Sequence, residues 1–477
     1  MCFKLIQNLY NYICLIKNIR NYYNNVINNS YYDDTLLSNI INRINNCGAV
    51  TIKFCQWLLP KIEMIHIKNQ KPQWFIKLEK FYEECPTHSE EYTKIIFNKE
   101  FNESFDENYK IKRIIGSGSM GQVYHVDNII NNTEEVIKVL HPNIEENIDF
   151  FKKVISFLLW FPITRKKINR LFPFNIYKFI DDFYIQSDLV NEANNLIQFS
   201  RKYKNNDYII IPEVLKISKN ILIMTYEKGE SFYKSDINEY QKEKLITIFN
   251  IFVRSNQILF NLNHGDLHPG NWKIREENNI YKLIYYDFGY CWSIENKIFI
   301  DMGPLFWETF ENSTKENVDD TINNLCKIMY YIILYDDKDK DDNFKLKIRE
   351  HINKNIDKLK PWNISPFELL QCTIDFCIQE SLLINPTLIQ GFIMQMQLQK
   401  LFEDYNLQSS EENDICDYEV FRERYLNILT LCKTLHIFPE YTKYIENKLN
   451  KKNVIVESLF DTINIGDNIK NLIKFDN

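Results

Sequence analysis

The sequence HGDLHPGN at residues 264–271, followed by YDFG at residues 286–289, guides the interpretation of the whole chain. It supplies Asp266, then Asn271, then Asp287, in the order that phosphoryl transfer from a metal nucleotide requires. One carboxylate would position or deprotonate the acceptor, while the amide and the second carboxylate would hold Mg²⁺ on the phosphates. Each motif alone is a weak signal, but their order and spacing together predict a segment for phosphoryl transfer.

A glycine-rich segment, GSGSMGQV at residues 116–123, lies between two strand-like runs. Its pattern is G-x-G-x-x-G-x-V, in which backbone N–H groups can donate to phosphates. A plain hairpin or a dinucleotide fingerprint would share the glycines, but the fingerprint should open a helix, and here a second strand follows. We therefore expect a kinase-type phosphate loop, with nucleotide-binding residues Gly116, Ser117, Gly118, Ser119, Gly121 and Val123, joined by Met224 and Tyr226 from a later strand.

Lys138 lies inside a short β-branched run, EVIKVL at residues 135–140. Burying a lysine there is costly unless it meets an anion, which a pair of nucleotide phosphates would supply. A helix predicted over residues 176–203 offers two acids, Asp188 and Glu192, four residues apart on one face. Either could pair with Lys138, and a solvated acidic stripe is the competing interpretation.

Composition limits the class of protein. The chain has 477 residues and a net charge of −7, so no nucleic-acid partner is expected. The 11 cysteines are scattered, and His264 and His268 are followed by Pro269 and Gly270 in a predicted loop, which disfavours zinc. No run approaches the roughly 18 apolar residues of a spanning helix, and no secretory signal is evident. We expect an intracellular protein, cytosolic or peripheral to an internal membrane.

Residues 1–105 are predicted to be helical. The first helix carries apolar residues at helical spacing, which favours packing on the protein over lying on a membrane surface. A later segment, GAVTIKFCQWLLP at residues 48–60, predicts an amphipathic helix that Pro60 should end. Lys53 and Gln56 share one face of it, and by themselves they would be a solvated polar stripe.

Taken together, these residues resemble the aarF/UbiB family of atypical protein-kinase-like proteins, which is linked to ubiquinone biology. The resemblance runs from about Gly48 to Gly289. The K-x-G-Q helix of the family is echoed at residues 52–57, and KVLHP at residues 138–142 and DLHPGN at residues 266–271 are also characteristic. The family's E-x-D…E-A-x-N pattern is matched by Asp188, Glu192, Ala193 and Asn194.

The resemblance implies an α+β, bilobal protein-kinase-like fold that binds ATP and Mg²⁺. It divides the chain into a helical extension (1–105), an N-lobe with a helical insert (106–230) and a mostly helical C-lobe (231–477). By carry-over, Lys138 binds phosphates, Glu192 is its ion-pair partner and Asp266 is the catalytic aspartate. The metal ligands would be Asn271 and Asp287, and a regulatory clamp over the nucleotide would comprise Lys53, Gln56, Gln186 and Asp188.

Departures from the family bear on activity. Cys55 and Gln186 replace a glycine and a glutamate of its motifs, which should weaken the clamp, because a neutral hydrogen bond is worth about half a charge-assisted one. The family usually has an alanine-rich phosphate loop, whereas this chain has three glycines. Gly265 stands where many protein kinases have arginine, and no A-P-E follows the D-F-G.

These absences favour ATP hydrolysis, or transfer to a small-molecule or lipid-like acceptor such as a quinone precursor, over peptide phosphorylation. A membrane surface is a further expected partner. Two alternatives remain: a small-molecule kinase resembling aminoglycoside or choline kinases, which lack the Lys53/Gln56 helix, and a nucleotide-binding pseudokinase. The pseudokinase is disfavoured because all five expected active-site residues, from Lys138 to Asp287, are present.

Overall fold

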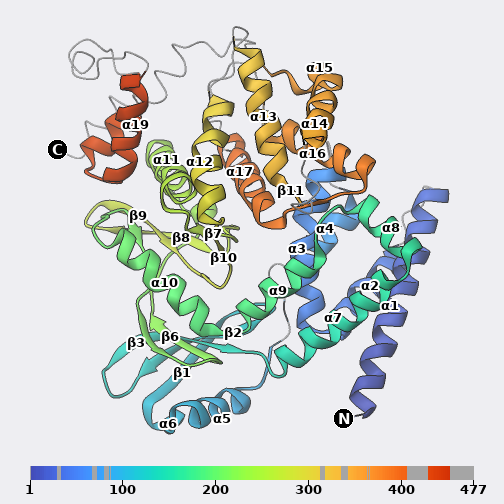
Figure 1. Ribbon diagram of the computed structural model, residues 1–477. Coiled ribbons are helices and arrows are strands. Elements are labelled where there is room, and N and C mark those ends of the chain that lie inside the picture. The colour runs from blue at the N-terminus through green and yellow to red at the C-terminus, as the bar shows by residue number, and fades with distance from the viewer. Residues whose placement is uncertain are drawn as a thin grey trace. The chain divides into compact units, whose positions relative to one another are not determined.

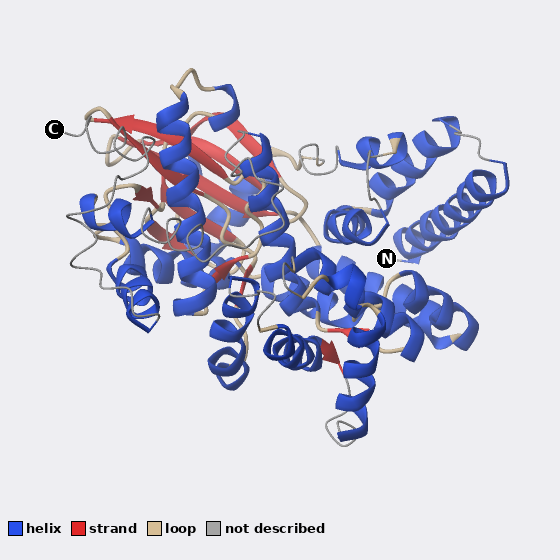
Figure 2. Ribbon diagram, turned by 90° about the horizontal axis from the view of Figure 1, so that it is seen from above, coloured by secondary structure: helices blue, strands red, loops and turns tan. Residues whose placement is uncertain are grey.

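The computed structural model describes residues 2–29, 34–66, 72–79, 85, 87–311, 317–334, 342–361, 364, 366–404 and 428–451. The chain forms two compact units. The first unit comprises residues 1–167, 176–194 and 213–226, and the second comprises residues 168–175, 195–212 and 227–477. Helices and antiparallel sheet occur in both (Figures 1 and 2), so the predicted α+β class is confirmed.

Helices make up most of the first unit. They are α1 (Cys2–Asn29), α2 (Asp34–Cys47), α3 (Ala49–His66), α4 (Gln73–Glu79), α5 (Glu90–Phe101), α6 (Phe105–Asn108), α7 (Ile144–Trp160), α8 (Pro162–Leu171), α9 (Ile176–Gln186) and α10 (Leu189–Tyr203), of which α8 and α10 continue into the second unit. Helix α1 packs through Tyr12, whose ring lies 5.7 Å from that of Phe150 on α7. The same helix leaves Leu9, Ile13 and Ile16 exposed.

Helix α3 does not end at Pro60, contrary to the sequence-based expectation, but runs on to His66. Proline removes one helical N–H donor and usually kinks a helix without always ending it. Buried side chains on both sides of Pro60 hold the helix in place here: Trp57 and Leu59 before it and Lys61 after it. The ammonium of Lys61 donates to the carbonyl of Trp57 at 3.1 Å and lies 4.2 Å from its ring centroid. Tertiary packing therefore outweighs the local signal.

The sheet of the first unit has five antiparallel strands in the order β1-β2-β3-β6-β5 (Figure 1). Their bounds are β1 (Tyr109–Ser117), β2 (Gly121–Asn128), β3 (Thr133–Leu140), β5 (Val214–Ile217) and β6 (Ile221–Thr225). One face packs against α5 and α6 in a core that includes Phe97, Phe105 and Tyr124. Side chains alternate between faces, so the opposite face carries Lys138 with its register partner Val123.

The predicted single helix over residues 176–203 is two helices, α9 and α10, separated at Ser187 and Asp188. Both side chains bond to nearby backbone, which competes with helix formation. The hydroxyl of Ser187 donates to the carbonyl of Tyr184 at 2.8 Å, and Asp188 accepts from the N–H of Val190 at 2.9 Å. Asp188 therefore caps α10 instead of lying on its face.

In the part of the second unit that the structure describes, three small sheets are combined with helices. A three-stranded sheet has the order β4-β9-β8, and the pairs β7–β10 and β11–β12 form the other two. The strands are β4 (Ile209–Ile210), β7 (Asn263–His264), β8 (Trp272–Glu277), β9 (Ile280–Tyr285), β10 (Cys291–Trp292), β11 (Ile333–Leu334) and β12 (Leu383–Ile384). The loop between β7 and β8 contains Asp266 and Asn271, and Asp287 follows β9.

The helices of the second unit are η2 (Phe232–Lys234), α11 (Glu239–Ser255), the π-helix η3 (Asn256–Phe260), α12 (Asn296–Glu311), α13 (Val318–Ile332), α14 (Asp342–Lys354), α15 (Ile356–Leu359), α16 (Pro366–Glu380), α17 (Pro386–Asp404) and α19 (Pro439–Lys451). Tyr285 of β9 stacks on Phe252 of α11 at 4.1 Å, which anchors the sheet on that helix. Among the described helices, none combines the length and apolar character needed to cross a bilayer.

Candidate active site

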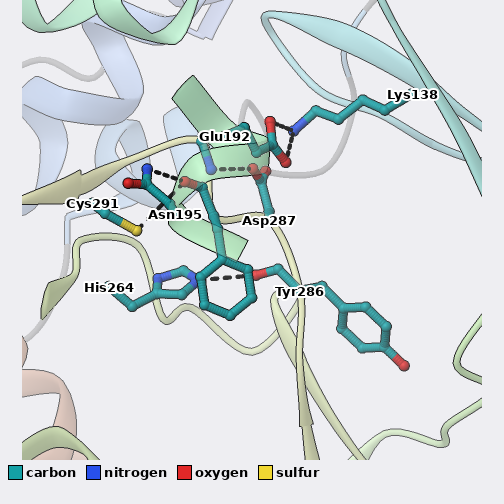
Figure 3. Close-up of polar contacts among 9 residues, drawn as sticks. Lys138, Glu192, Asn195, His264, Tyr286, Asp287 and Cys291 are labelled. Atoms are coloured by element: carbon teal, nitrogen blue, oxygen red, sulfur yellow. Dashed lines mark hydrogen bonds and ion pairs between the residues drawn. The ribbon is translucent and has the colours of Figure 1, made fainter. Parts of the chain in front are cut away.

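A buried ion pair joins strand β3 to helix α10 in the first unit (Figure 3). The ammonium of Lys138 lies 2.8 Å from each carboxylate oxygen of Glu192. Lys138 is only 8% exposed and Glu192 3%. Sequence reasoning left Asp188 and Glu192 open as partners, and in the structure Glu192 makes the contact. The two hydrogen bonds hold the ammonium on the sheet face opposite α5 and α6.

The expected phosphate loop connects β1 and β2. The N–H of Gly118 donates to the carbonyl of Gly121 at 2.9 Å, which closes the turn. Gly121 is required by packing, because a Cβ there would lie 2.6 Å from the carbonyl oxygen of Val139. Gly116 differs: a Cβ there would meet nothing within 4 Å, so no neighbouring atom demands glycine. Its Cβ position remains open for a ligand that approaches the backbone closely.

A chain of hydrogen bonds supports this loop from within the first unit. It runs from Gln122 Nε2 to the hydroxyl of Tyr124 (2.6 Å), to the hydroxyl of Thr93 (2.8 Å) and to Nε2 of His88 (3.0 Å). From Nδ1 of His88 it continues to Nδ1 of His141 (2.8 Å), whose Nε2 reaches the carbonyl of Gly118 (2.9 Å). The carbonyl of Gly118 is therefore bonded to His141, which is itself bonded to His88.

A carbonyl oxygen can only accept, so Nε2 of His141 donates to Gly118. A neutral imidazole carries one N–H, so with both rings neutral His88 donates from Nδ1 to His141, Thr93 donates to Nε2 of His88, and Tyr124 donates to Thr93. Burial lowers the pKa of His88 to about 4, with the neighbouring His141 adding to the shift, and burial also lowers the pKa of His141. These lowered pKa values favour the neutral form of both rings, which gives the hydrogen bonds this direction.

Helix α3 reaches the phosphate loop through Gln56. The hydroxyl of Ser119 donates to the side-chain oxygen of Gln56 at 3.1 Å, and the amide nitrogen of Gln56 lies 3.9 Å from the sulfur of Cys85. Burial raises the pKa of Cys85 to about 11, and the charge of nearby Lys53 opposes that rise. Lys53 and Gln56 therefore both lie near Cys85. The other two expected clamp residues make local contacts: Gln186 donates to the carbonyl of Asp182 at 3.3 Å, and Asp188 caps α10.

Strand β6 contributes the remaining expected nucleotide-binding residues. Met224 is the register partner of Val136 and shares the sheet face of Lys138. Tyr226 follows the strand and stacks on His125 with ring centroids 3.8 Å apart. His125 is itself paired with Val136 across β2 and β3, so it lies on the same face. Sequence reasoning missed His125, whose signal was its period-two spacing from Val123.

In the second unit, His264 organises the loop that carries Asp266. The backbone N–H of Asp266 donates to Nδ1 of His264 at 3.2 Å. Nε2 of the same ring donates to the carbonyl of Tyr286 at 2.9 Å (Figure 3). Burial lowers the pKa of His264, which keeps the imidazole neutral and Nδ1 able to accept. His264 therefore links Asp266, which the sequence analysis expects to be the catalytic aspartate, to the residue before Asp287.

Asn271 is held by its amide and its backbone. Its Nδ2 donates to the carbonyl of Asp266 at 2.8 Å, its N–H donates to the carbonyl of His268 at 2.8 Å, and its own carbonyl accepts from Tyr286. Because the nitrogen of the amide is engaged, Oδ1 is the atom that can coordinate a cation. Asp287, exposed and with a left-handed φ of 53°, supplies a carboxylate. Amide and carboxylate oxygens fit Mg²⁺, which prefers hard oxygen ligands.

The phenylalanine of the D-F-G segment is fully buried in the second unit. Phe288 packs against Phe199 of α10 and the ring of His264, each with centroids 4.8 Å away. Its carbonyl accepts from Nδ2 of Asn195 at 2.9 Å (Figure 3). The asparagine of the E-A-x-N pattern is thus Asn195, three residues after Glu192, and not Asn194, which is exposed. The spacing of the E-A-x-N pattern already points to Asn195, whereas the sequence-based assignment names Asn194, one residue earlier.

Gly265 has a steric explanation. A Cβ at this position would lie 2.5 Å from a ring atom of Tyr290 and 2.9 Å from its carbonyl oxygen. The N–H of Gly265 also donates to that carbonyl at 2.7 Å, across the β7–β10 pair. The arginine that many protein kinases carry here could not be accommodated without moving Tyr290.

A family model identifies the family of this chain. The model of the ABC1 atypical kinase-like domain matches residues 80–321, just over half of the chain. The chain belongs to the ABC1 atypical kinase-like family. This confirms the resemblance to the aarF/UbiB family, whose members named UbiB are among the relatives, and it confirms the kinase-like fold.

Individual relatives are distant. The probable serine/threonine-protein kinase abkC of Dictyostelium discoideum is 30% identical over 260 residues, which are 50% of this chain and 35% of that protein. The probable protein kinase UbiB of Pasteurella multocida is 27% identical over 182 residues, 36% of this chain and 34% of that protein. The chain therefore spans about a third of the length of these curated relatives. A solved structure of a Mycobacterium tuberculosis protein, titled as a complex of Rv3197 with erythromycin, is 14% identical, covering 75% of this chain and 90% of that one, with a TM-score of 0.41.

Proposed function

We propose that this ABC1-family chain binds Mg-ATP and transfers or hydrolyses the γ-phosphate. The Lys138–Glu192 ion pair carries the proposal. A buried ammonium held by both oxygens of a carboxylate, on a sheet face bordered by a glycine-rich loop, suits the α- and β-phosphates of a nucleotide. On that face Val123, Val136 and Met224 supply apolar contacts for the base.

In this proposal the second unit supplies the chemistry. The carboxylate of Asp266 orients the acceptor or water and takes its proton. Asn271 through Oδ1 and Asp287 through its carboxylate would hold Mg²⁺, which neutralises charge on the phosphates. His264 keeps the backbone of Asp266 in place through its neutral ring.

The acceptor in this proposal is water or a small, lipid-like molecule such as a quinone precursor, at the surface of an internal membrane. The packing of Tyr290 against Gly265 supports this choice, because the arginine that would bind a phosphorylated activation loop has no room. The absence of an A-P-E sequence after Gly289 removes the usual peptide platform.

Thermal unfolding with and without Mg-ATP tests nucleotide binding. A ligand that binds only the folded state raises the melting temperature by mass action. We expect a rise for the wild type and little rise for Asp287→Asn. Asp106→Asn is the matched control, because this exposed aspartate pairs with Lys94 on the surface. No shift with saturating Mg-ATP in the wild type would contradict the proposal.

Turnover of ATP tests the chemistry. We expect phosphate release that Asp266→Asn lowers by at least about a hundredfold, the usual contribution of a positioned base. Adding a quinone-like phenol should raise the rate if the acceptor is of that class. Binding of Mg-ATP without any turnover would show a pseudokinase, and equal turnover in Asp266→Asn would remove the role given to that residue.

A further inference from the structure

Helices α7 and α8 follow each other directly along the chain and meet at a turn (Figure 1). Large apolar side chains are exposed at this turn. Phe157 is 63% exposed, Trp160 74%, Phe161 42% and Ile163 76%. The ring of Phe161 lies 5.3 Å from that of Phe157 and 5.1 Å from that of Trp160, so the aromatic residues form one cluster. Contiguous exposed apolar surface of this kind marks an interaction site.

The same turn is strongly basic. Residues 150–175 include Lys152, Lys153, Arg165, Lys166, Lys167 and Arg170, and contain no aspartate or glutamate. The chain as a whole carries a net charge of −7, so this segment is an island of positive charge. Arg165, Lys166 and Lys167 begin two residues after the exposed Ile163, and all three are exposed. We call these three residues, with Phe157, Trp160, Phe161 and Ile163, the α7–α8 corner.

We propose that the α7–α8 corner docks the first unit on an anionic phospholipid bilayer. Tryptophan and phenylalanine are suited to the boundary between headgroups and acyl chains, and clustered lysine and arginine bind anionic headgroups. The corner presents both at one place. An acidic protein partner would satisfy the charge, but the aromatic side chains protrude at a turn, where a bilayer can admit them without a matching pocket.

Helix α1 of the first unit also exposes apolar residues. It packs on α7 through Tyr12 and exposes Leu9, Ile13 and Ile16 at helical spacing. Two helices in mutual contact thus both leave apolar residues uncovered. The sequence predicts that the first helix packs on the protein. Helix α1 can do so through Tyr12 and still present its exposed apolar residues to a membrane.

Sedimentation of the full chain with vesicles tests this proposal, without nucleotide, so that the result is independent of the proposed function. We expect binding to phosphatidylcholine mixed with phosphatidylglycerol, weaker binding at high salt, and much weaker binding to phosphatidylcholine alone. Trp160→Ser and Ile163→Ser should each lower the affinity about tenfold. Lys166→Gln should lower it about fivefold.

Ile130→Ser is the matched control. Ile130 is 70% exposed in the β2–β3 turn, close in sequence to the acidic Glu134 and Glu135, and its loss should leave binding unchanged. Because every substituted side chain is exposed, the melting temperatures of these variants should match that of the wild type. Brominated lipids give a second measurement: they should quench tryptophan fluorescence in the wild type, and Trp160→Phe should lose most of that quenching.

Several outcomes would overturn the proposal. They are equal binding to both vesicle types, no binding to either, corner variants that bind like Ile130→Ser, and quenching that survives Trp160→Phe. A dimer in sedimentation velocity that Trp160→Ser dissociates, without vesicle binding by the wild type, would assign the corner to a second copy of the chain.

Discussion

Replacing Glu192 with glutamine removes the negative charge that faces Lys138 while keeping the shape of the side chain. The ammonium, 8% exposed, would then lie beside a neutral amide whose oxygen can replace only one of two contacts at 2.8 Å. Breaking a buried ion pair from one side costs about 3–5 kcal/mol. Since one hydrogen bond can survive, we expect Glu192→Gln to lower the free energy of unfolding by about 3 kcal/mol. This is a large part of the roughly 5–15 kcal/mol that keeps a domain folded.

Urea unfolding of Glu192→Gln, followed by circular dichroism, measures this loss as a lower transition midpoint. The matched variant is the double replacement Lys138→Met with Glu192→Leu, which removes both charges and fills the space with apolar atoms. It should recover most of the stability, because no uncompensated charge remains, but it should not be stabilised by Mg-ATP.

Two results would refute this reasoning. A Glu192→Gln protein within about 0.5 kcal/mol of the wild type, the usual range of a surface substitution, would show that the pair is not buried as described. A double variant less stable than the single one would show that packing, and not an isolated charge, is what the substitution disturbs.

Three further predictions concern the supporting residues. Gly116→Ala should leave the melting temperature unchanged but weaken ATP binding, whereas Gly121→Ala should cost about 2 kcal/mol through its contact with β3; equal effects of both in unfolding and nucleotide titrations would contradict this. The pKa of His88 is lowered to about 4, so below its ordinary value of 6.5 the unfolded chain takes up a proton that the folded one does not. Stability should therefore fall as pH drops through that window, and His88→Gln should flatten the fall; an unchanged profile would show that His88 does not titrate as described. Asn195→Ala should weaken Mg²⁺ dependence of ATP turnover through the lost bond to the D-F-G carbonyl, whereas Asn194→Ala, at an exposed site, should not; matching Mg²⁺ titrations would refute the role.

Features encoded by neighbouring residues were predictable from the sequence. The strand, glycine-rich turn and strand around Gly118 follow from alternation and turn chemistry, and Lys138 was identified because a charged residue interrupts a β-branched run. The family resemblance rested on such motifs taken together, and the α+β class was what that resemblance implied. Each of these signals is contained in a short run of residues.

Features that depend on distant contacts were not predictable. Helix α3 continues past Pro60 because buried residues on both sides hold it, and local propensity carries no record of that burial. The chain through His88 and His141 joins residues 53 positions apart, with no shared motif. The break at Ser187 was readable in principle from two side chains that cap helices, but the apolar spacing on either side masked it.

The core beneath the five-stranded sheet has a consequence for how small a working piece of this chain can be. Phe97 and Phe105 come from helices that precede the first strand, yet they fill the same core as Tyr124. His88, earlier still, completes the support of the phosphate loop. A fragment trimmed to begin at Tyr109 would keep the glycine-rich loop, Lys138, Glu192 and the motifs that follow them. It would lose the two core phenylalanines and His88. It should expose an apolar sheet face and aggregate, so the minimal soluble fragment should begin before His88.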